Sequence, residues 1–295
     1  MADSPYSIIK IGLPKGSLEQ PTLNLFAKSG WKISLRNRNY FPEINDPTIT
    51  ARLCRVQEIP RYVADGVLDA GLTGKDWILE SDADVVVVAD LVYSKASNRP
   101  ARWVLAVAGD SPYMKPEDLA GKRVATEIMG LAQRYFKGKN VPVNVQYSWG
   151  ATEAKVVEGL ADAIVEVTET GTTIRANGLR IIDEVLVTNT QLIANKKAWE
   201  NPEKRAKIEH ITMLLQGALR AEGMVGLKMN APSSNLDNVL AILPSLNSPT
   251  VAQQQDPRWV SLEVVVGIEI VRDLIPQLVA AGVEGIIEFP LNKVI

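Results

Sequence analysis

The chain has very few of the side chains on which many enzymes build a nucleophile or a metal site. Its 295 residues include one cysteine, Cys54, and one histidine, His210. A single cysteine excludes a disulfide framework and a cysteine-based zinc site. A single histidine excludes a histidine-rich metal site and any histidine-dependent catalytic triad away from His210.

Long apolar runs and clustered charges are also missing. No apolar stretch has the roughly 20 residues needed to span a membrane, and Val85–Val88 is short enough to be a buried strand. The first residues, Met1–Pro5, do not read as a signal peptide. The net charge of -2, with scattered lysine and arginine, gives no support for nucleic-acid binding. We therefore expect a soluble, cytoplasmic protein that binds neither nucleic acid nor membranes.

Short apolar strands alternate with amphipathic helices over the first two thirds of the chain. A strand at Ser7–Leu13 precedes a helix at Leu18–Ser29, for which Ser17 and Gln20 have capping-box spacing and Gly30 marks the end. Such alternation is typical of parallel sheets with helices on both faces. The sequence therefore predicts an α/β fold.

A short sequence echo indicates two related lobes. Gly66–Ala70 and Gly159–Ala163 share the pattern Gly-x-x-Asp-Ala, and each leads from a predicted helix into a buried strand. This turn pattern is common, so the echo has little weight by itself. Two α/β lobes that face one another would form a cleft, and ligands bind at the carboxyl ends of the strands in such folds.

The remaining third of the chain has a different pattern. Residues 198–221 have the apolar spacing of one long amphipathic helix, which we expect to be a connector. The later segments alternate as β–α–β–β–α–β, the ferredoxin-like order. We predict a first lobe at 1–100, with 180–200 returning to it, a second lobe at 101–179, a connector helix at 201–222 and a ferredoxin-like domain at 223–295.

Residues 159–179 form the most informative segment. A buried strand at 161–167 runs into Thr168–Thr173, and a short helix follows. Successive backbone N–H groups, threonine hydroxyls and a helix N-terminus can hold a phosphate, and Gly171 allows the backbone to approach it closely. Glu166 can accept from ribose hydroxyls beside that phosphate. The segment indicates a phosphorylated-sugar site, with a polar loop that only caps the helix as the alternative.

This segment resembles the phosphoribosyl-pyrophosphate loop of the ATP phosphoribosyltransferase family. Other segments fit the same family in the same order along the chain: Leu13–Leu18, Asp69–Asp76, Gly121–Thr126, Gly150–Glu153, Ala231–Pro232, Leu246–Thr250 and Asp256–Trp259. The resemblance covers nearly the whole chain. Because it includes the C-terminal part, it is a resemblance to the long, self-contained form of the family.

The resemblance implies a two-lobed, periplasmic-binding-protein-like catalytic part and a regulatory ferredoxin-like domain. It implies transfer of the 5-phosphoribosyl group from phosphoribosyl pyrophosphate to N1 of ATP, the first step of histidine biosynthesis. Mg2+ is expected to accompany the diphosphate, histidine to inhibit, and dimers to assemble into hexamers. Adenine N1 has a free lone pair and pyrophosphate leaves readily, so alignment and electrostatics can supply the catalysis. This chemistry suits a chain with one histidine.

The resemblance also assigns residues to the substrates. The expected catalytic residues are Glu166, Lys15 and Arg55. The residues expected to bind phosphoribosyl pyrophosphate are Glu153, Glu166, Thr168, Glu169, Thr170, Gly171, Thr172 and Thr173. Those expected to bind ATP or pyrophosphate are Lys15, Gly16, Thr73, Gly74, Asp76 and Arg102.

Ordinary structural roles remain as alternatives for several of these residues. Glu166 could cap the turn after its strand, and Glu153 could favour the macrodipole of its helix. Lys15 could be a solvated loop lysine. Arg55 and Arg102 could each be the partner in a surface ion pair instead of binding phosphate oxygens.

In the last domain, the resemblance places histidine near Asn230, Leu246, Ser248 and Thr250. Relatives often have aspartate at the position of Asn230, so we expect histidine to bind more weakly here; a simple turn residue is the alternative. Two other functions stay open at this point. One is a non-catalytic two-lobed small-molecule-binding or sensing protein, and the other is a phosphoribosyltransferase that accepts a different base.

Overall fold

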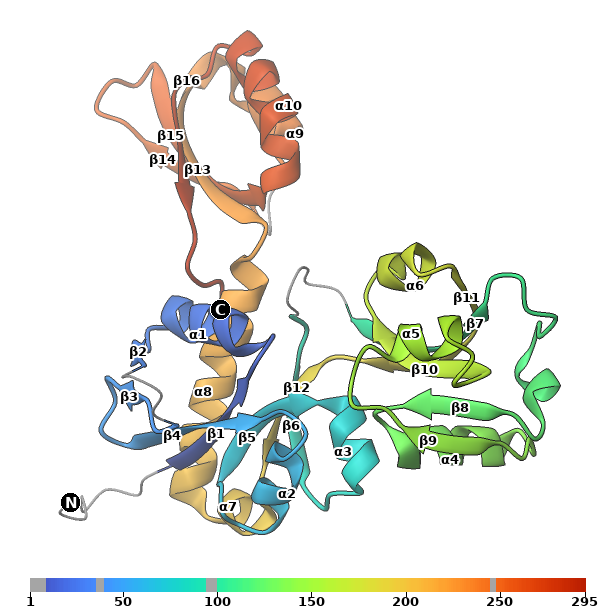
Figure 1. The fold of residues 1–295 in the computed structure, drawn as a ribbon. Coiled ribbons are helices and arrows are strands. Elements are labelled where there is room, and N and C mark those ends of the chain that lie inside the picture. The colour runs from blue at the N-terminus through green and yellow to red at the C-terminus, as the bar shows by residue number, and fades with distance from the viewer. Residues whose placement is uncertain (1–8, 36–39, 94–99, 245–247) are drawn as a thin grey trace. The chain divides into compact units, whose positions relative to one another are not determined.

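The structure is a computed structural model, and it describes residues 9–35, 40–93, 100–244 and 248–295. It divides into two compact units, Met1–Thr212 and Met213–Ile295, which are described separately. The first unit contains two lobes, each built on a five-stranded sheet (Figure 1). Within the described ranges, none of the helices has both the length and the apolar character needed to cross a membrane.

The first lobe has the strand order β4-β1-β5-β12-β6. Its main strands are β1 (Ile9–Lys15), β4 (Ile49–Arg55), β5 (Ala70–Gly74), β6 (Val86–Leu91) and β12 (Thr190–Ala194), and β2 (Ile33–Ser34) pairs with β3 (Glu43–Ile44) in a small separate sheet. Its helices are α1 (Glu19–Ser29), α2 (Ile59–Ala64), α3 (Lys75–Ser81) and α7 (Lys196–Glu200). Fully buried aliphatic side chains on alternate strand positions, such as Ile9, Ile11 and Leu13, form its core.

The second lobe has the strand order β11-β7-β10-β8-β9. Its strands are β7 (Ala101–Ala108), β8 (Arg123–Thr126), β9 (Asn144–Tyr147), β10 (Ala163–Thr168) and β11 (Leu179–Thr188). Its helices are the 3-10 turn η1 (Pro116–Leu119), α4 (Met129–Gly138), α5 (Thr152–Val157) and α6 (Thr172–Ala176). Trp103, Phe136 and Val165 are among the buried side chains between the sheet and α4.

The two sheets repeat one another. In each, three neighbouring strands pair in parallel and the other two strands are joined by antiparallel pairings, so β1, β4 and β5 correspond to β8, β9 and β10. Asp69 Oδ2 accepts from the backbone N–H of Lys10 at 2.8 Å, and Asp162 Oδ2 accepts from that of Arg123 at 2.9 Å. The sequence echo therefore marks a repeat in which the same aspartate ties each β5-like strand to its parallel neighbour.

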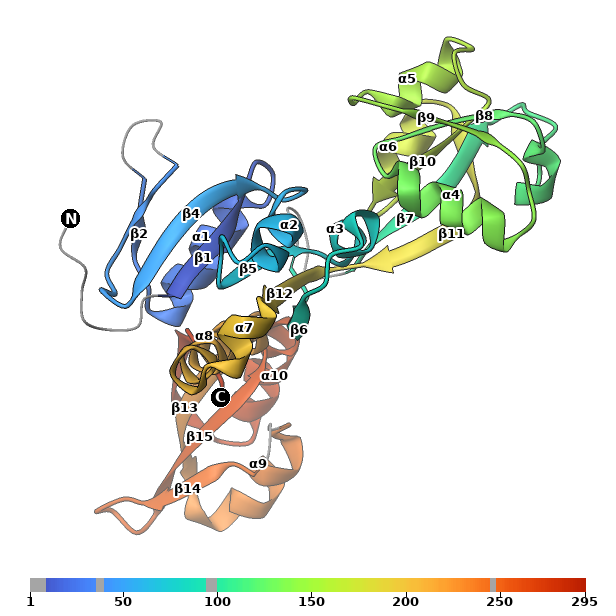
Figure 2. The same cartoon turned by 90° about the horizontal axis from the view of Figure 1, so that it is seen from below.

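Two segments of chain connect the lobes, one after β6 and one between β11 and β12 (Figure 2). Residues 180–188 lie in the second sheet, because β11 pairs with β7 over Leu179–Thr188. Only the strand that follows Asn189 returns to the first sheet, where β12 pairs with β5 and β6. The prediction that the chain returns to the first lobe at residue 180 is therefore wrong. The return comes about one strand later, with β12.

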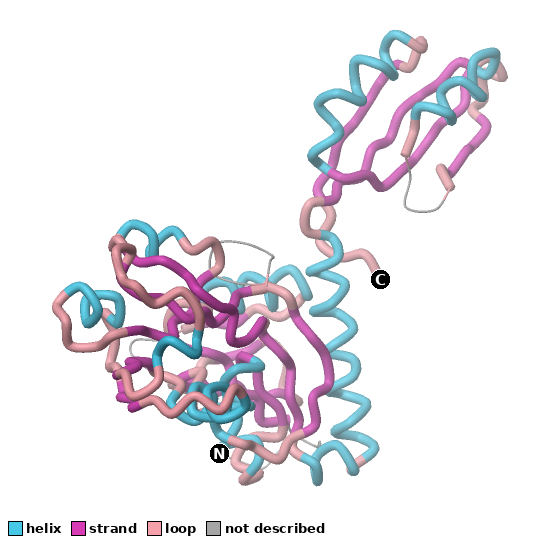
Figure 3. The backbone as a smooth tube through the Cα atoms, turned by 90° about the vertical axis from the view of Figure 1, so that its right-hand side faces the viewer, coloured by secondary structure: helices cyan, strands magenta, loops and turns pink. Residues whose placement is uncertain are grey.

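Two helix predictions also need correction. Helix α1 begins at Glu19 with Leu18 as its N-cap and no side-chain cap, so Ser17 and Gln20 form no capping box; Gly30 ends the helix as expected, with φ of 106°. The long helix is broken into α7 and α8 (Pro202–Ala221) (Figure 3). Pro202 begins α8, and Asn201 Oδ1 accepts from the backbone N–H groups of Glu203 and Lys204, each at 3.1 Å.

The second unit contains an antiparallel sheet with the order β14-β15-β13-β16. Its elements are β13 (Met224–Pro232), the 3-10 turn η2 (Ser233–Asn235), α9 (Leu236–Ile242), β14 (Thr250–Gln253), β15 (Trp259–Gly267), α10 (Ile268–Ala280) and β16 (Glu284–Pro290). Both helices pack on one face of the sheet, where Leu227, Leu262 and Leu278 are fully buried (Figure 1). This is the ferredoxin-like arrangement, and the predicted fold class is confirmed.

Candidate functional site

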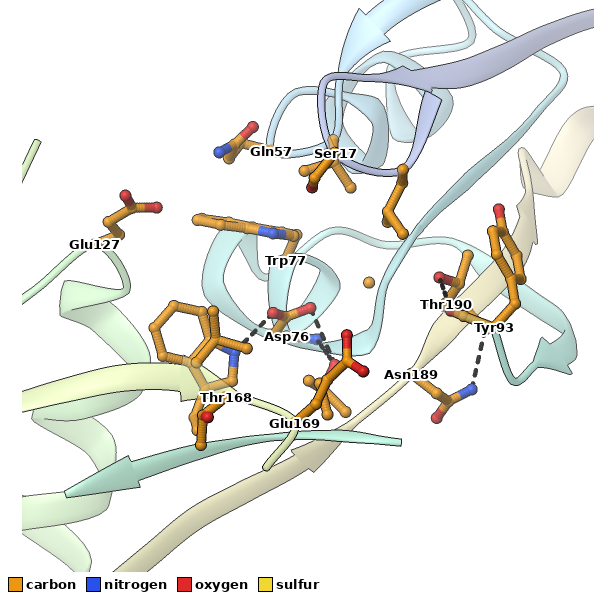
Figure 4. A pocket seen from close by; sticks show the side chains of 17 residues that line it. Ser17, Gln57, Asp76, Trp77, Tyr93, Glu127, Thr168, Glu169, Asn189 and Thr190 are labelled. Atoms are coloured by element: carbon orange, nitrogen blue, oxygen red, sulfur yellow. Dashed lines mark hydrogen bonds between the residues drawn. The ribbon is translucent and has the colours of Figure 1, made fainter. Parts of the chain in front are cut away.

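A cavity of about 340 Å3 lies where the carboxyl ends of strands from both sheets meet (Figure 4). The first lobe lines it with Ser17 after β1, Gln57 after β4 and Gly74 at the end of β5. The second lobe lines it with Glu127 after β8 and with Thr168 and Glu169 at the end of β10. Because the two sheets repeat, equivalent strand ends contribute from each side, as expected for a ligand site in this class of fold.

The loop after β10 has an unusual backbone. Gly171 has φ of 74° and is the N-cap of α6. Its backbone N–H donates to Thr168 Oγ1 at 2.8 Å, and the hydroxyls of Thr170 and Thr172 are 2.8 Å apart. Thr173, in the first turn of α6, is exposed. The loop therefore gathers backbone N–H groups and threonine hydroxyls at one place, which is the composition of an anion site.

Glu166 lies half-buried on β10, just before this loop. Its Oε1 accepts from the backbone N–H of Val167 at 3.1 Å, and the Thr152 hydroxyl also forms a hydrogen bond with the carboxylate. Burial raises the pKa of Glu166 to about 7; the hydrogen bonds oppose this shift and the carboxylates of Glu153 and Glu127 add to it. Glu153, in the first turn of α5, is therefore close enough to Glu166 for its charge to affect the Glu166 pKa.

Asp76 lines the cavity, but its carboxylate is already engaged. It accepts from Trp103 Nε1 at 2.7 Å on β7 and from the Thr188 hydroxyl at 3.1 Å on β11. Burial raises the pKa of Asp76, and these two hydrogen bonds oppose the shift. Its proximity to ATP or pyrophosphate stays a prediction, while its contacts show that Asp76 links α3 to the second lobe.

Lys15 and Arg55 lie side by side at the ends of β1 and β4, in a smaller hollow of about 280 Å3. The Lys15 ammonium is 4.2 Å from the centre of the Tyr40 ring, and the side chains of Glu58 and Tyr62 line the same hollow. Lys15 and Arg55 do not line the larger cavity. The structure therefore groups the two predicted catalytic cations with each other, in a hollow distinct from the larger cavity.

The remaining predicted residues of the first lobe are divided between cavity and core. Gly16 has φ of 105° and directly precedes Ser17 of the cavity. Thr73 is fully buried, and its hydroxyl donates to the carbonyl of Val56 at 2.8 Å, so it supports the cavity from behind. Arg102, on β7 of the second lobe, forms an ion pair with Glu184 at 3.4 Å. An ion pair of this kind is the alternative to phosphate binding that the sequence left open for Arg102.

Glu127 is one of the cavity residues that the sequence motifs did not indicate. It directly follows β8 and precedes α4, and burial raises the pKa of its carboxyl group. Trp77, on α3, also lines the cavity, and its ring is 6.4 Å from that of Trp103. The signal that could have identified Glu127 is the repeat, because it places this residue at the carboxyl end of a parallel strand.

The described residues contain no cluster of three or more histidine, cysteine, aspartate or glutamate side chains that could hold a metal ion. The carboxylates of Glu127 and Glu153 add to the raised pKa of Glu166, but the three side chains do not form such a cluster. The cavity residues therefore do not fit a metal ion held by the protein alone.

In the second unit, Asn230 lies on β13, and its Oδ1 accepts from Gln254 Nε2 at 2.6 Å. Ser248 and Thr250 are exposed, and Thr250 begins β14. Leu246 lies outside the described residues. Asn230 and Thr250 flank the strand β15 on opposite sides, because β13 and β14 both pair with it.

Comparisons with known proteins give the same family over nearly the whole chain. The family model described as HisG, ATP phosphoribosyltransferase, matches residues 55–217, and the one described as HisG, C-terminal domain, matches residues 221–293. An ATP phosphoribosyltransferase of Nitratidesulfovibrio vulgaris (strain DSM 19637 / Miyazaki F) is 73% identical over 289 residues, which cover 98% of this chain and 99% of that protein. One of Solidesulfovibrio magneticus is 68% identical, over 98% of this chain and 99% of that protein.

A solved structure is also similar. The ATP phosphoribosyl transferase (HisG:HisZ) complex from Thermotoga maritima has a chain that matches with a TM-score of 0.61 and 29% sequence identity. The match covers 71% of this chain and 96% of that chain.

Replacement of Glu166 by glutamine is expected to stabilise the protein more at high pH than at low pH. The folded-state pKa of Glu166 is about 7 against a usual 4.5, so ionisation in the folded state is disfavoured. The wild-type free energy of unfolding therefore falls as pH rises from 4.5 through about 7, and glutamine removes this loss. We expect E166Q to gain about 1–2 kcal/mol at about pH 8, after allowance for partial solvent screening.

Urea unfolding at about pH 5 and about pH 8 measures this difference. The matched control is Glu158→Gln, which makes the same chemical change at an exposed glutamate of the same lobe. An equal effect of E166Q at both pH values would contradict the assignment of a raised pKa to Glu166.

Proposed function

Because the chain belongs to the ATP phosphoribosyltransferase family, in the long form that has a C-terminal domain, we propose that the cavity between its two lobes is the active site. The chain is a pentosyltransferase of the first step of histidine biosynthesis, and its substrates are ATP and phosphoribosyl pyrophosphate. The non-catalytic binding protein considered from the sequence is not favoured by these relatives. What remains to assign is the place of each substrate.

The 5-phosphate of phosphoribosyl pyrophosphate is held by the loop Thr168–Thr173. The observation that carries this assignment is the left-handed backbone at Gly171, with φ of 74°, which turns the chain so that neighbouring N–H groups and threonine hydroxyls gather. Such a site binds a phosphate dianion by hydrogen bonds and does not need a lysine. Glu169, which lines the cavity, faces the space that the sugar occupies in this proposal.

Glu166 accepts hydrogen bonds from the ribose hydroxyls, and Glu153, on α5, contacts the same substrate. A carboxylate strengthens such hydrogen bonds only when it is ionised, and the pKa of Glu166 is about 7. Positive charge that develops on the sugar as its bond to pyrophosphate breaks is stabilised by the same carboxylate. Glu166 is therefore proposed both to bind the sugar and to favour the transition state.

Lys15 and Arg55 receive the phosphate oxygens of pyrophosphate or of ATP. They lie next to one another at the ends of two parallel strands, beside the exposed backbone of Gly16. Gly74 lies at the equivalent end of β5 and lines the cavity. Thr73 and Asp76 act by holding these strand ends in place. Arg102, on β7, lies beside the loop, because it is the register partner of Thr168 on β10.

The transfer requires no strong base from the protein. The lone pair of adenine N1 forms the new bond to C1 of the sugar, while the bond from C1 to pyrophosphate breaks and pyrophosphate keeps the electron pair. Family members generally use a divalent metal, and we propose that Mg2+ enters with the diphosphate of the substrate, since the described side chains offer no resident site. When bound there, it would spread the charge of the leaving group.

The C-terminal domain at 223–295 is proposed to bind histidine as a feedback inhibitor. Asn230, Ser248 and Thr250 are its described candidate contacts, and Leu246 belongs to the same proposal from the sequence alone. The side chain of Asn230 is neutral, so it offers no ion pair to the ammonium group of histidine. We also propose that the chain assembles as a homo-oligomer, with dimers that form a hexamer.

Replacement of Gly171 by alanine is expected to raise KM for phosphoribosyl pyrophosphate by about tenfold or more, with a much smaller effect on KM for ATP. An added Cβ would lie 2.9 Å from Arg175 Nη1 and 3.3 Å from Ile181 Cδ1, at a φ of 74° that favours glycine. The measurement is pyrophosphate release that depends on both substrates.

The matched control is Gly159→Ala, where φ is 69° but nothing lies within 4 Å of the added Cβ. This variant has the same kind of backbone strain outside the loop and is expected to keep a normal KM. A G171A variant that folds and binds the sugar diphosphate normally would contradict the proposed phosphate site.

Replacement of Asn230 by aspartate is expected to tighten histidine binding by about two- to fivefold, since an exposed ion pair contributes about 0.2–1 kcal/mol. A carboxylate can still accept from Gln254, so the local contact survives. Calorimetric titration of histidine into both proteins measures the change. Asn238→Asp, on α9, is the control for a general effect of added charge, and the absence of any gain in N230D would refute the role of Asn230.

A further inference from the structure

Helix α3 of the first lobe and helix α4 of the second lobe cap one another. Glu80, in the last turn of α3, accepts from two consecutive backbone N–H groups of α4: Oε1 from Gly130 at 2.9 Å and Oε2 from Leu131 at 2.7 Å. In the opposite direction, the Arg134 guanidinium donates to the backbone carbonyl of Leu79. Each helix therefore supplies the side chain that satisfies the end of the other.

Three features of these hydrogen bonds make them strong. The first N–H groups of a helix have no partner within the helix, and a carboxylate at that end also complements the helix dipole. A cation at the last carbonyls of α3 complements the other end in the same way. Hydrogen bonds with one ionised partner are also stronger than neutral ones. The pair of caps therefore favours one particular arrangement of α3 and α4.

Residues on or next to the same two helices line the cavity. Trp77 is one helical turn before Glu80 on α3, and Glu127 is two residues before the start of α4; both line the cavity. At the start of α3, Asp76 holds β7 and β11 through Trp103 and Thr188. Helix α3 is thus attached to the second lobe at both of its ends, and the Glu80 contact fixes the end nearest α4.

We propose that Glu80 is a positioning residue for the transfer reaction. It holds the start of α4, and with it Glu127, at a fixed distance from Trp77, and so sets the width of the cleft before substrates bind. It acts through α4 and through no contact with a substrate. This inference rests on the proposed location of the active site, and it adds a residue that no sequence motif indicates.

Kinetics with both substrates provide the first test. Glu80→Ala removes both hydrogen bonds, and Glu80→Gln leaves one acceptor oxygen; we expect KM for both substrates to rise by about tenfold for alanine and less for glutamine, with a smaller change in kcat. Gly130→Ala approaches the same contact from the other side, since its Cβ would lie 3.3 Å from Oε2 and 3.4 Å from Oε1 of Glu80. It is expected to raise KM in the same direction.

Glu200→Gln is the matched control, because it makes the same chemical change at an exposed glutamate of α7. Melting temperatures of all variants separate positioning from general instability. A merely structural role would lower the amount of active protein and leave KM unchanged. Unchanged KM in folded E80A would overturn the proposal.

A distance measurement without substrates provides the second test. In a Cys54→Ala background, spin labels on cysteines introduced at Lys137 of α4 and Lys197 of α7 report the spacing of the lobes, and both positions are exposed. We expect the distribution of distances to be broader in E80A than in the parent and unchanged in E200Q. Identical distributions in E80A and the parent would overturn the proposal.

The two tests also separate this inference from the proposed active site. Because the spin-label distance involves no substrate, it reports the tie between α3 and α4 even if phosphoribosyl pyrophosphate binds elsewhere. Failure of the active-site assignment would show instead as a normal KM in G171A. A broader distance distribution with unchanged KM in E80A would show that the tie does not position the reaction, and would also count against the proposal.

Discussion

Parallel strands from both sheets end at the same cavity, and the rest of the site depends on this constraint. A parallel strand must be followed by a crossover, so its carboxyl end always leads into a loop and usually into a helix. In this chain, β1, β4 and β5 meet β8 and β10 in that way. Backbone N–H groups, glycines with positive φ and strand-end carboxylates are therefore brought together from segments that are far apart in sequence.

The carboxylates of the site have a different role from its backbone N–H groups and hydroxyls. Both substrates carry several negative charges, yet Glu127, Glu166 and Glu169 lie in or beside the space that would receive them. Backbone N–H groups and hydroxyls can hold a phosphate without a nearby cation, which leaves the carboxylates to the ribose hydroxyls and to the cationic sugar of the transition state. The raised pKa of Glu166 is the cost of keeping such a group half-buried, and perturbed carboxyl groups in a cleft are typical of functional sites.

Local patterns were sufficient to predict much of this fold. Apolar periodicity and glycine positions act over a few residues. They predict the strand–loop–helix at 163–176 and the β–α–β–β–α–β order of the last domain. The Gly-x-x-Asp-Ala echo identified the repeat because the same turn and the same aspartate hydrogen bond recur in both lobes. The pair Asn201-Pro202 also indicates a helix boundary, because proline is tolerated best in the first turn of a helix. The apolar spacing on both sides of it nevertheless favoured one continuous helix.

Contacts between distant residues could not be predicted. Whether 179–188 joins the first or the second sheet depends on its pairing with β7, which periodicity does not encode. Asp76 carries a sequence signal for a ligand site, but its partners, Trp103 and Thr188, come from strands that only the fold brings near. Glu127 and Glu80 have no motif at all, since one is defined by the end of a strand and the other by the start of a helix in the opposite lobe.

A crystal structure of this chain with phosphoribosyl pyrophosphate bound would locate the 5-phosphate directly. We expect the 5-phosphate within hydrogen-bonding distance of the backbone N–H groups and hydroxyls of residues 168–173, and the ribose hydroxyls on the carboxylate of Glu166. A 5-phosphate bound instead beside Lys15 and Arg55, with the loop after β10 making no contact with the ligand, would contradict this expectation.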